Sequence, residues 1–392
     1  MRVPNPWRWH AAITIAVLSM ALASVGHSQE LDDVLLDGIC ADAGTGPDLQ
    51  AQCAVFDLDS PTRGAAAAGN NFGIAGGTGR GKTDVRDRLE ALREGEEEQG
   101  SGQAADWVIG KLGIFISGDG AWLDRDNTGN EIGHDTLTAG FTAGADWRFS
   151  DAFIAGAAFS YSRGSTEFNN NAGDLDTDSY SALLFASFAP NDIIYFDAYI
   201  GYGFQDYEGK RNIAFVAGGV PVAARANSDT DGTEFTAGMS AAADFALGAF
   251  TLGPHAQLDY VDTDVDGYAE SGGAGFAAAF GDQSIESTQS VIGVHLSYAA
   301  STSWGVLVPY GRLDWVHEFQ DKARSIPTSF VQSPGNPFVT RTDKATRDFG
   351  RITLGISALW AGGWAAFADY QNEFAQEDQT EHRLSIGLRR EF

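Results

Sequence analysis

Few residues in this chain have the types and spacing of a catalytic site. His317 and Glu318 are adjacent, and an imidazole beside a carboxylate could act as a general acid and base. We expect structural hydrogen bonding from His317 instead, because it falls among aromatic residues at the end of a strand. Gly118-Asp119-Gly120 resembles an esterase motif only in passing, since it has no nucleophilic serine. The chain has no GxSxG, HExxH or Walker sequence, so we predict no catalytic residues and no enzyme.

Four acidic residues alternate at the end of one segment, and they are the best candidates for a cation site: Asp259, Asp262, Asp264 and Asp266. Carboxylates do bind calcium, but this spacing is not that of an EF-hand loop. We interpret these residues as the solvated acidic rim of a strand. We expect no metal and no cofactor.

The two cysteines, Cys40 and Cys53, lie in the N-terminal part of the chain. In an oxidising compartment they could close a small disulfide loop, and the alternative is a pair of reduced, buried thiols. A zinc site is not expected, because no histidine lies near them and two thiolates alone rarely hold zinc. We predict the disulfide.

Residues 1–28 have the plan of a secretory signal peptide. Arg2 and Arg8 are basic, residues 11–26 are apolar and uncharged, and small residues provide cleavage positions. The apolar run is short for a membrane helix, which needs about 20 residues. The formal net charge of −28 excludes a nucleic-acid partner, whose phosphates need a basic surface.

Residues 29–82 read as a short N-terminal segment and linker, and a helix with its linker follows at 83–106. Val85, Leu89 and Leu92 recur at helical spacing on one narrow stripe. Charged side chains cover the rest of this helix, so either a water-filled lumen or bulk solvent would accept it.

From Trp107 onward the pattern changes to a period of two residues. In residues 136–147, apolar residues alternate with Thr, Gly and Asp, and the same alternation recurs at 196–205 and 234–245. Side chains alternate across a strand, so each segment faces two different media. Twelve such segments are joined by five tight turns and six longer polar connections, which is typical of an outer-membrane β-barrel.

Aromatic residues gather at both ends of these segments. One set crowds the tight turns and includes Trp147 and Phe153, and the other set, near the opposite rim, includes Trp122 and Trp315. Two girdles about one strand length apart mark the two interfaces of a bilayer. A water-soluble β-sandwich would not need aromatic residues at every second turn.

Two features fit this pattern less well. Pro254 and Pro309 fall inside predicted strands, where proline cannot donate a ladder hydrogen bond, so we expect a bulge or break near the periplasmic rim. The first strand, near residues 113–123, does not alternate cleanly.

Charged residues on the inward face of the strands are the predicted lumen lining. They would hydrate a pore and could pair with a charged helix, and the alternative is that they pair with one another across the wall. The candidates are Arg148, Asp197, Glu234, Asp244, Arg312, Asp314, Arg351, Arg383 and Arg389.

Several segments resemble the β-domain of classical autotransporters, the type V secretion family. They are LVPYGRLDWVHEF at 307–319, LGPHAQLDYVDTDVDGYAESGG at 252–273, the C-terminal HRLSIGLRREF, and TDVRDRLEALREG upstream. The resemblance covers residues 83–392. It implies an all-β fold: a twelve-stranded antiparallel transmembrane β-barrel over 107–392, with an N-terminal helix threading its pore.

The resemblance also implies that the last strand is the signal read by the barrel assembly machinery. Leu384, Ile386, Leu388 and Phe392 fall on one face of that strand, as such a signal requires, whereas Arg390 stands where an aromatic residue is more usual.

The implied function is that of an outer-membrane translocator and anchor in a Gram-negative cell, which exports or displays a short N-terminal segment. Long β-solenoid passengers would not fit between the signal peptide and the helix. The alternatives are a porin-like channel or loop-presenting adhesin without a translocated passenger, and a secreted soluble β-protein. The expected partners are outer-membrane lipid and the assembly machinery, and the sequence specifies no surface ligand.

Overall fold

The computed structural model describes residues 111–217 and 220–392, in which twelve antiparallel strands close into one barrel. The twelve-stranded prediction is confirmed, and the ring closes where the first strand pairs with the last. The wall consists, in order, of β1 (Leu112–Arg125), β2 (His134–Ser150), β3 (Phe153–Phe168), β4 (Gly173–Phe188), β5 (Ile194–Ala217), β6 (Val220–Ala243), β8 (Phe250–Val265), β12 (Gln283–Tyr298), β14 (Gly305–Glu318), β17 (Asp348–Trp360), β18 (Trp364–Phe374) and β19 (Gln379–Glu391).

Three predictions fall on residues 1–110: the signal peptide, the Cys40–Cys53 disulfide and the helix at 83–98. They lie outside the described residues. In the described part of the chain, no helix has the length and hydrophobicity needed to cross a membrane.

The two faces of the wall differ as the alternation predicts. On β5, the outward Phe196, Ile200 and Phe204 are 47 %, 49 % and 60 % exposed, whereas the inward Asp197 and Gln205 are buried. A water-soluble protein rarely exposes so continuous an apolar surface, and lipid would cover it. The first strand alternates as cleanly as the others, with Ile114 and Ile116 outward and Ser117 and Asp119 inward.

One part of the inner face is apolar, contrary to the expectation of polar residues and glycine alone. Phe115, Ile154, Ala158, Leu183, Phe185 and Tyr199 form a buried cluster, the apolar wall, on the inner side of β1, β3, β4 and β5. Glycines on neighbouring strands make room for its rings. A Cβ added at Gly144 would lie 2.5 Å from the Phe115 ring, and one at Gly156 would lie 2.4 Å from the Phe185 ring.

Pro254 and Pro309, the two prolines predicted to fall inside strands, each lie where one hydrogen-bond ladder ends. The β6–β8 ladder ends at the Ala242–His255 pair, next to Pro254, and the short strand β7 (Phe245–Leu247) resumes the pairing with β8. The β12–β14 ladder ends at the Ser297–Tyr310 pair, next to Pro309, and β13 (Ala300–Ser301) pairs with β14 beyond it. Because proline has no N–H to donate, each ladder is interrupted at the residue that cannot continue it.

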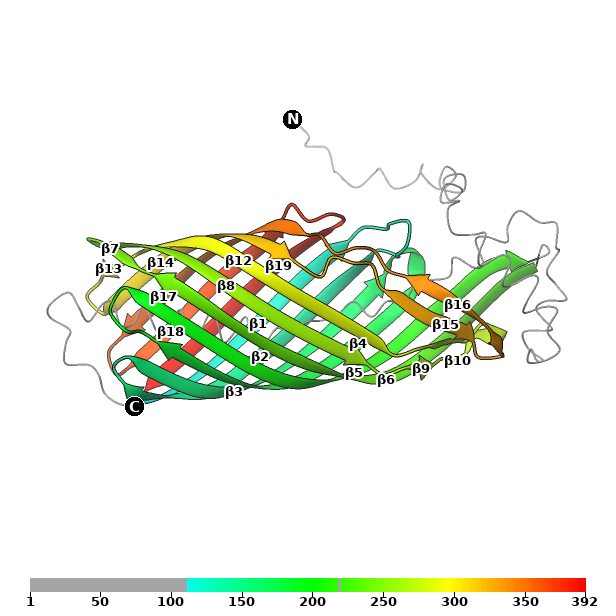
Figure 1. Cartoon of the computed structure of the whole chain (residues 1–392), viewed down its shortest axis with the longest axis horizontal. Helices are drawn as coiled ribbons and strands as arrows, with labels where there is room; N and C mark the ends of the chain where they lie inside the picture. Colours follow the sequence, from blue (N-terminus) through cyan, green and yellow to red (C-terminus); the bar gives the residue numbers. More distant parts are fainter. Residues whose placement is uncertain (1–110, 218–219) are drawn as a thin grey trace, which may run out of the picture.

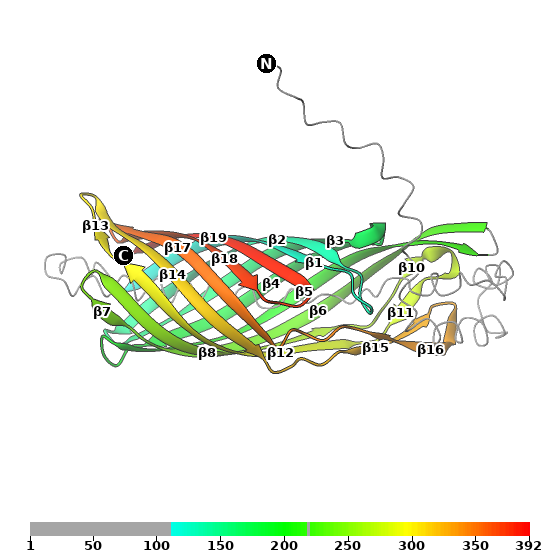
Figure 2. The same ribbon diagram turned by 90° about the horizontal axis from the view of Figure 1, so that it is seen from above.

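The longer connections are not simple loops. Residues 206–232 form one of the six longer connections expected from the sequence, but much of this range is strand, because β5 and β6 stay paired from Ile194 to Ala217. Strands β9 (Tyr268–Ala269), β11 (Ala278–Phe280), β15 (Ser325–Phe330) and β16 (Ser333–Arg341) form a second sheet, and β10 (Ser271–Gly272) pairs with β6. Figures 1 and 2 show these elements at one end of the barrel, with β7, β13 and the C terminus at the other.

A buried ion pair holds this outer headpiece, defined as β9–β11, β15, β16 and the distal halves of β5 and β6. Arg211 donates to both carboxylate oxygens of Glu270 at 2.8 and 2.6 Å and to the Phe276 carbonyl at 2.8 Å. Ile213, Phe276 and Phe330 pack together as a small apolar core beside it. The outer headpiece is therefore a folded unit in which three connections meet.

Because one face of the wall is apolar and the other encloses polar groups, an added charge should lower the free energy of unfolding more on the outward face than on the inward face. Leu184→Arg places a charge on the outward face midway along β4, where Leu184 is 62 % exposed to the surroundings of the barrel. We expect it to lower the free energy of unfolding by about 2–4 kcal/mol in lipid vesicles, measured by urea titration. Ser181→Arg, on the inward face of the same strand, is the control, and an equal loss there would contradict the assignment of the faces.

Candidate functional site

The barrel lumen is the candidate functional site, because the charged side chains predicted to line it all occupy inward positions. Strand alternation places them on the buried side of β2, β5, β6, β14, β17 and β19, with Asp244 between β6 and β7. The set is Arg148, Asp197, Glu234, Asp244, Arg312, Asp314, Arg351, Arg383 and Arg389.

Two histidine–carboxylate pairs lie near the short-turn end of the lumen. His255 Nε2 is 2.8 Å from Asp314 Oδ1, and the Arg312 Nε donates to both oxygens of Asp314 at 3.0 and 2.9 Å. His295 Nε2 is 3.2 Å from Asp244 Oδ1, and the two imidazole rings stack with centroids 6.5 Å apart. Sequence reasoning missed both histidines, although their inward positions follow from the same alternation.

Two further carboxylates accept hydrogen bonds from neutral side chains. Ser240 donates to Asp197 at 3.1 Å, and Gln205 donates to Glu234 at 3.0 Å. Each donor lies on the strand next to its acceptor, because β5 pairs with β6.

A longer contact spans β6: Tyr199 on β5 donates to Asp259 on β8 at 2.5 Å. Asp259 also accepts two hydrogen bonds from Gln257. The strand between them carries a glycine here, and a Cβ at Gly238 would lie 2.4 Å from the Tyr199 ring. Gly238 therefore leaves room for the Tyr199 side chain to pass over β6 and reach Asp259 on β8.

Three further arginines of this set pair with acids, either on their own strand or across one or two strands of the wall. Arg351 donates to Glu373 at 3.0 and 2.8 Å, and Arg383 lies 3.5 Å from Glu381. Arg389 pairs with Glu391 and lies 3.8 Å from Asp146. Each of these pairs joins two side chains of the barrel wall. The sequence left this arrangement open as the alternative to pairing with a charged helix. The charges hydrate the lumen in either case.

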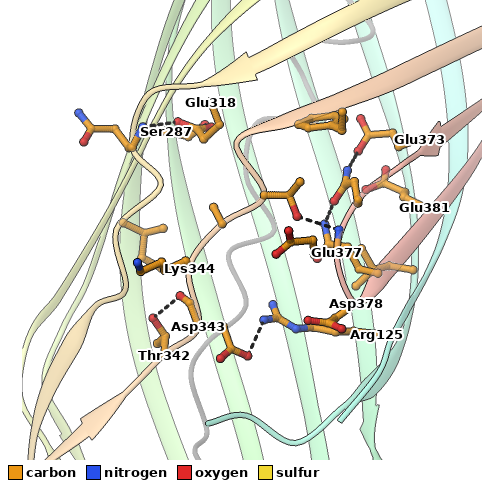
Figure 3. Close-up of a pocket in the computed structure, with 18 of the residues that line it drawn as sticks. Arg125, Ser287, Glu318, Thr342, Asp343, Lys344, Glu373, Glu377, Asp378 and Glu381 are labelled. Atoms are coloured by element: carbon orange, nitrogen blue, oxygen red, sulfur yellow. Dashed lines mark hydrogen bonds and ion pairs between the residues drawn. The ribbon is translucent and has the colours of Figure 1, made fainter. Parts of the chain in front are cut away.

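A cavity of about 570 Å³ opens at the headpiece end of the lumen and contains both signs of charge. Figure 3 shows Arg125, Lys344, Glu318, Glu373 and Glu381 around it, on strand ends and on the connection between β16 and β17. Arg351 and Arg383, both predicted from the sequence, are part of its lining. Within the described ranges, no group of three or more His, Cys, Asp or Glu residues is arranged to hold a metal ion.

Residues 342–346, here called the strap, are tied at the cavity to the loop that joins β1 and β2. Asp343 accepts hydrogen bonds from Thr128 at 2.5 Å and from Asn130 at 2.7 Å, and lies 3.3 Å from Arg125 Nη2. The backbone N–H of Asp343 donates to Glu131, which also pairs with Arg125 at 2.5 Å. These contacts join parts of the chain more than 200 residues apart, so no local sequence signal could reveal them.

These contacts between the strap and the β1–β2 loop are here called the latch, and the pKa values of its two carboxylates, Asp343 and Glu131, are shifted in opposite directions. Burial alone would raise the pKa of Asp343, but hydrogen bonds from Thr128 and Asn130 outweigh it and hold the pKa below its usual 3.8. Burial raises the pKa of Glu131 above its usual 4.5, against the opposing effect of Arg125. Asp343 therefore strengthens the latch at neutral pH, and this contribution is lost as pH falls through its lowered pKa.

His317 and Glu318, the adjacent pair considered as a general acid and base, lie on opposite faces of the barrel wall. His317 points outward, where its Nδ1 lies 2.8 Å from Asp348, and packs on the Phe319 ring. Glu318 is buried on the inner side and accepts from Ser287 at 2.6 Å and from the Thr288 backbone at 3.0 Å. Adjacent residues on a strand point to opposite faces, so these two cannot share a substrate.

The acidic row is divided in the same way. Asp259 is inward, whereas Asp262 and Asp264 lie on the outward side of β8, so they do not converge on one ion.

The four residues predicted to form an assembly signal share one face of the last strand. Leu384, Ile386, Leu388 and Phe392 lie on its outward face and are 40 % to 59 % exposed. The Arg390 guanidinium, on the same face, lies over the rings of Trp364 and Phe392, at 5.1 and 4.5 Å from their centroids.

The geometry agrees with comparisons to known proteins. The family model described as "Autotransporter beta-domain" matches residues 114–371.

Among curated proteins, the chain is 25 % identical over 317 residues to "Lipase 1" of Photorhabdus luminescens, covering 78 % of this chain and 42 % of that protein. It is 29 % identical over 202 residues to an uncharacterized protein from the trpE-trpG intergenic region of Pseudomonas putida, covering 50 % of this chain and 32 % of that protein. The chain thus spans less than half the length of either curated relative.

Two solved structures share the fold at low identity. The translocator domain of NalP from Neisseria meningitidis superposes with a TM-score of 0.56 at 16 % identity, covering 78 % of this chain and 98 % of that one. The β-domain of Bordetella BrkA gives 0.51 at 18 % identity, covering 72 % and 100 %.

The pKa values of Asp343 and Glu131 are shifted in opposite directions, and this difference allows a test of the latch. A nitroxide at Ala345→Cys, in a Cys40→Ser, Cys53→Ser background, should be immobile at neutral pH and gain mobility as pH falls below the lowered pKa of Asp343. Asp343→Asn should free the label at neutral pH, because it removes the charge that Thr128, Asn130 and Arg125 bind. Glu131→Gln should leave it immobile, since it removes a buried charge whose desolvation is unfavourable. If neither Asp343→Asn nor acidification changes the mobility of the spin label, the latch is ruled out.

Proposed function

This chain belongs to the autotransporter β-domain family, and from that membership we propose that it exports the residues preceding its barrel through the lumen and anchors them at the cell surface. The barrel is an outer-membrane translocator of this type. Autotransporter β-domains reside in the outer membrane of Gram-negative bacteria, and we place this barrel there, in contact with lipid along its outward face.

The observation that carries the proposal is where the barrel begins. The Arg148 N–H, at the short-turn end of β2, donates to the Lys111 carbonyl just before β1, and the Phe392 N–H donates to Leu112 at the same rim. Short turns face the periplasm in outer-membrane barrels. The described chain therefore enters β1, at Lys111, on the periplasmic rim, and the lumen is a direct route from there to the cell surface.

We propose that the helix predicted at 83–98 occupies this lumen in one orientation. Its narrow stripe of Val85, Leu89 and Leu92 matches the apolar wall around Phe115 and Leu183. Its arginines and glutamates would then face the charged strands β12–β19 across the lumen.

The barrel itself is proposed to catalyse no reaction. Autotransporter β-domains are transport domains, and lipase activity is a property of the Photorhabdus relative, of which this chain matches less than half. The two adjacent residues that could form an acid–base pair point to opposite sides of the wall.

The face of β19 formed by Leu384, Ile386, Leu388 and Phe392 is proposed to be read by the barrel assembly machinery. Its outward position supports this, because an incoming last strand would present that apolar face before the lipid covers it.

A second candidate function, display of a binding surface by the connections, is favoured by the outer headpiece. A folded sheet with its own apolar core and a buried Arg211–Glu270 pair is more than a passive loop needs. In that case the N-terminal segment stays in the periplasm.

Surface exposure of the N-terminal segment tests the export proposal. An epitope inserted after Glu30 should bind antibody on intact cells, because this segment would have crossed the membrane. The same epitope in the short turn after Asp192, between β4 and β5, is the control and should bind only after the cells are permeabilised. Protection of the epitope after Glu30, with correct behaviour of the control, would favour the display function instead.

Removal of the proposed pore helix should open the lumen. We expect a barrel lacking residues 83–98 to show a larger single-channel conductance in a planar bilayer than the full chain, because the wall charges would then face only water. Leu89→Asp, which places a charge against the apolar wall, should raise the conductance in the same direction. Equal conductance of all three proteins would place the helix outside the lumen.

A further inference from the structure

On the outward, lipid-facing side of the described wall, one charged residue lies between the short turns and the outer aromatic girdle. From the short turns to the outer aromatic girdle, outward positions on the twelve strands hold aliphatic, aromatic, Met, proline, glycine, Ser or Thr side chains. Acidic outward residues such as Asp178 and Asp206 begin only beyond that girdle. The exception is Arg390, at the periplasmic end of β19.

Arg390 differs from its two sequence neighbours. Arg389 and Glu391 point inward and pair with each other, and Arg389 also faces Asp146. On the outward side, the residues in register with Arg390 are Ile114 on β1 and Trp364 on β18. Neither can neutralise a guanidinium, and among the described residues no carboxylate forms an ion pair with it.

Two aromatic rings nevertheless fix the place of this guanidinium. Its Cζ lies 5.1 Å from the Trp364 ring centroid and 4.5 Å from that of Phe392. Stacking of this kind orients the planar group and leaves its edge N–H groups available to an anion. A charge on the lipid face is least costly at the interface, where aromatic girdles lie.

We propose that Arg390, Trp364 and Phe392 form a binding site for the phosphate of a phospholipid in the periplasmic leaflet. A guanidinium donates two parallel hydrogen bonds to phosphate oxygens, while the two rings contact the glycerol and upper acyl chain. Free phosphate offers the same anion, but the position of the site on the bilayer-facing side of β19 favours the lipid. The site lies outside the lumen and does not depend on export.

Native mass spectrometry of the full folded chain in detergent, titrated with a short-chain phosphatidylglycerol, tests this site. Arg390→Gln should weaken retention of the first lipid by about tenfold, the usual effect of losing a charged hydrogen bond. Arg390→Lys keeps the charge without the two-pronged geometry and should weaken it less. Heat-modified gel mobility checks that each variant is folded, and Arg390→Lys carries the test if Arg390→Gln does not fold.

The matched control is Arg163→Gln. Arg163 is also outward, at the opposite rim, but it lies 3.8 and 3.9 Å from Asp176 and Asp178, so its loss should leave lipid retention unchanged. A digalactosyl lipid with the same acyl chains, which has no phosphate, should bind equally to the wild type and to Arg390→Gln. Equal phosphatidylglycerol retention by the wild type and the Arg390 variants would overturn the site. Displacement of the lipid by inorganic phosphate at equal concentration would overturn its assignment to lipid.

Discussion

Hydrocarbon offers no hydrogen-bond partner, so every peptide group within the membrane must find one in the chain itself. A sheet can meet this demand only by closing on itself. Here the closing ladder joins β1 to β19 from the Gly113–Glu391 pair to the Arg125–Gln379 pair. The outward apolar row and the inward charged row follow from this closure, because a closed ring gives each strand one lipid side and one enclosed side.

Closure also places charges where they are difficult to leave unpaired. The inward arginines and carboxylates lie near one another in a confined space, and most of those described here are matched within the wall, as in Arg351–Glu373 and His255–Asp314–Arg312. Matched pairs keep the lumen hydrated without giving it a strong excess of one sign. The apolar wall on β1–β5 breaks this uniformity and gives the lumen two chemically different sides.

The period of two residues was sufficient to predict the strand number and the inward positions of the charged set, but Asp259, interpreted as part of a solvated rim, is buried on the inner face. The period could not separate a long loop from a long strand, because the alternation continues through residues 206–214, with Tyr207 and Ile213 inward, in the part of β5 beyond the barrel. It predicted polar residues or glycine inside, and it missed Phe185, whose ring fits because Gly156 lies directly opposite it on the neighbouring strand β3. The latch through Asp343 was beyond prediction, since its partners are remote in sequence and are chosen by the folded loops.

The pairing of β1 with β19 has a consequence for the order of events during biogenesis. The ladder that seals the ring pairs β1 with β19, so the ring cannot close before the strand at Gln379–Glu391 has been synthesised. Until then both margins of the sheet carry unpaired peptide groups that lipid would not accept. A wall without β19 is therefore a sheet that hydrocarbon cannot accept, and insertion of the closed barrel depends on this one strand.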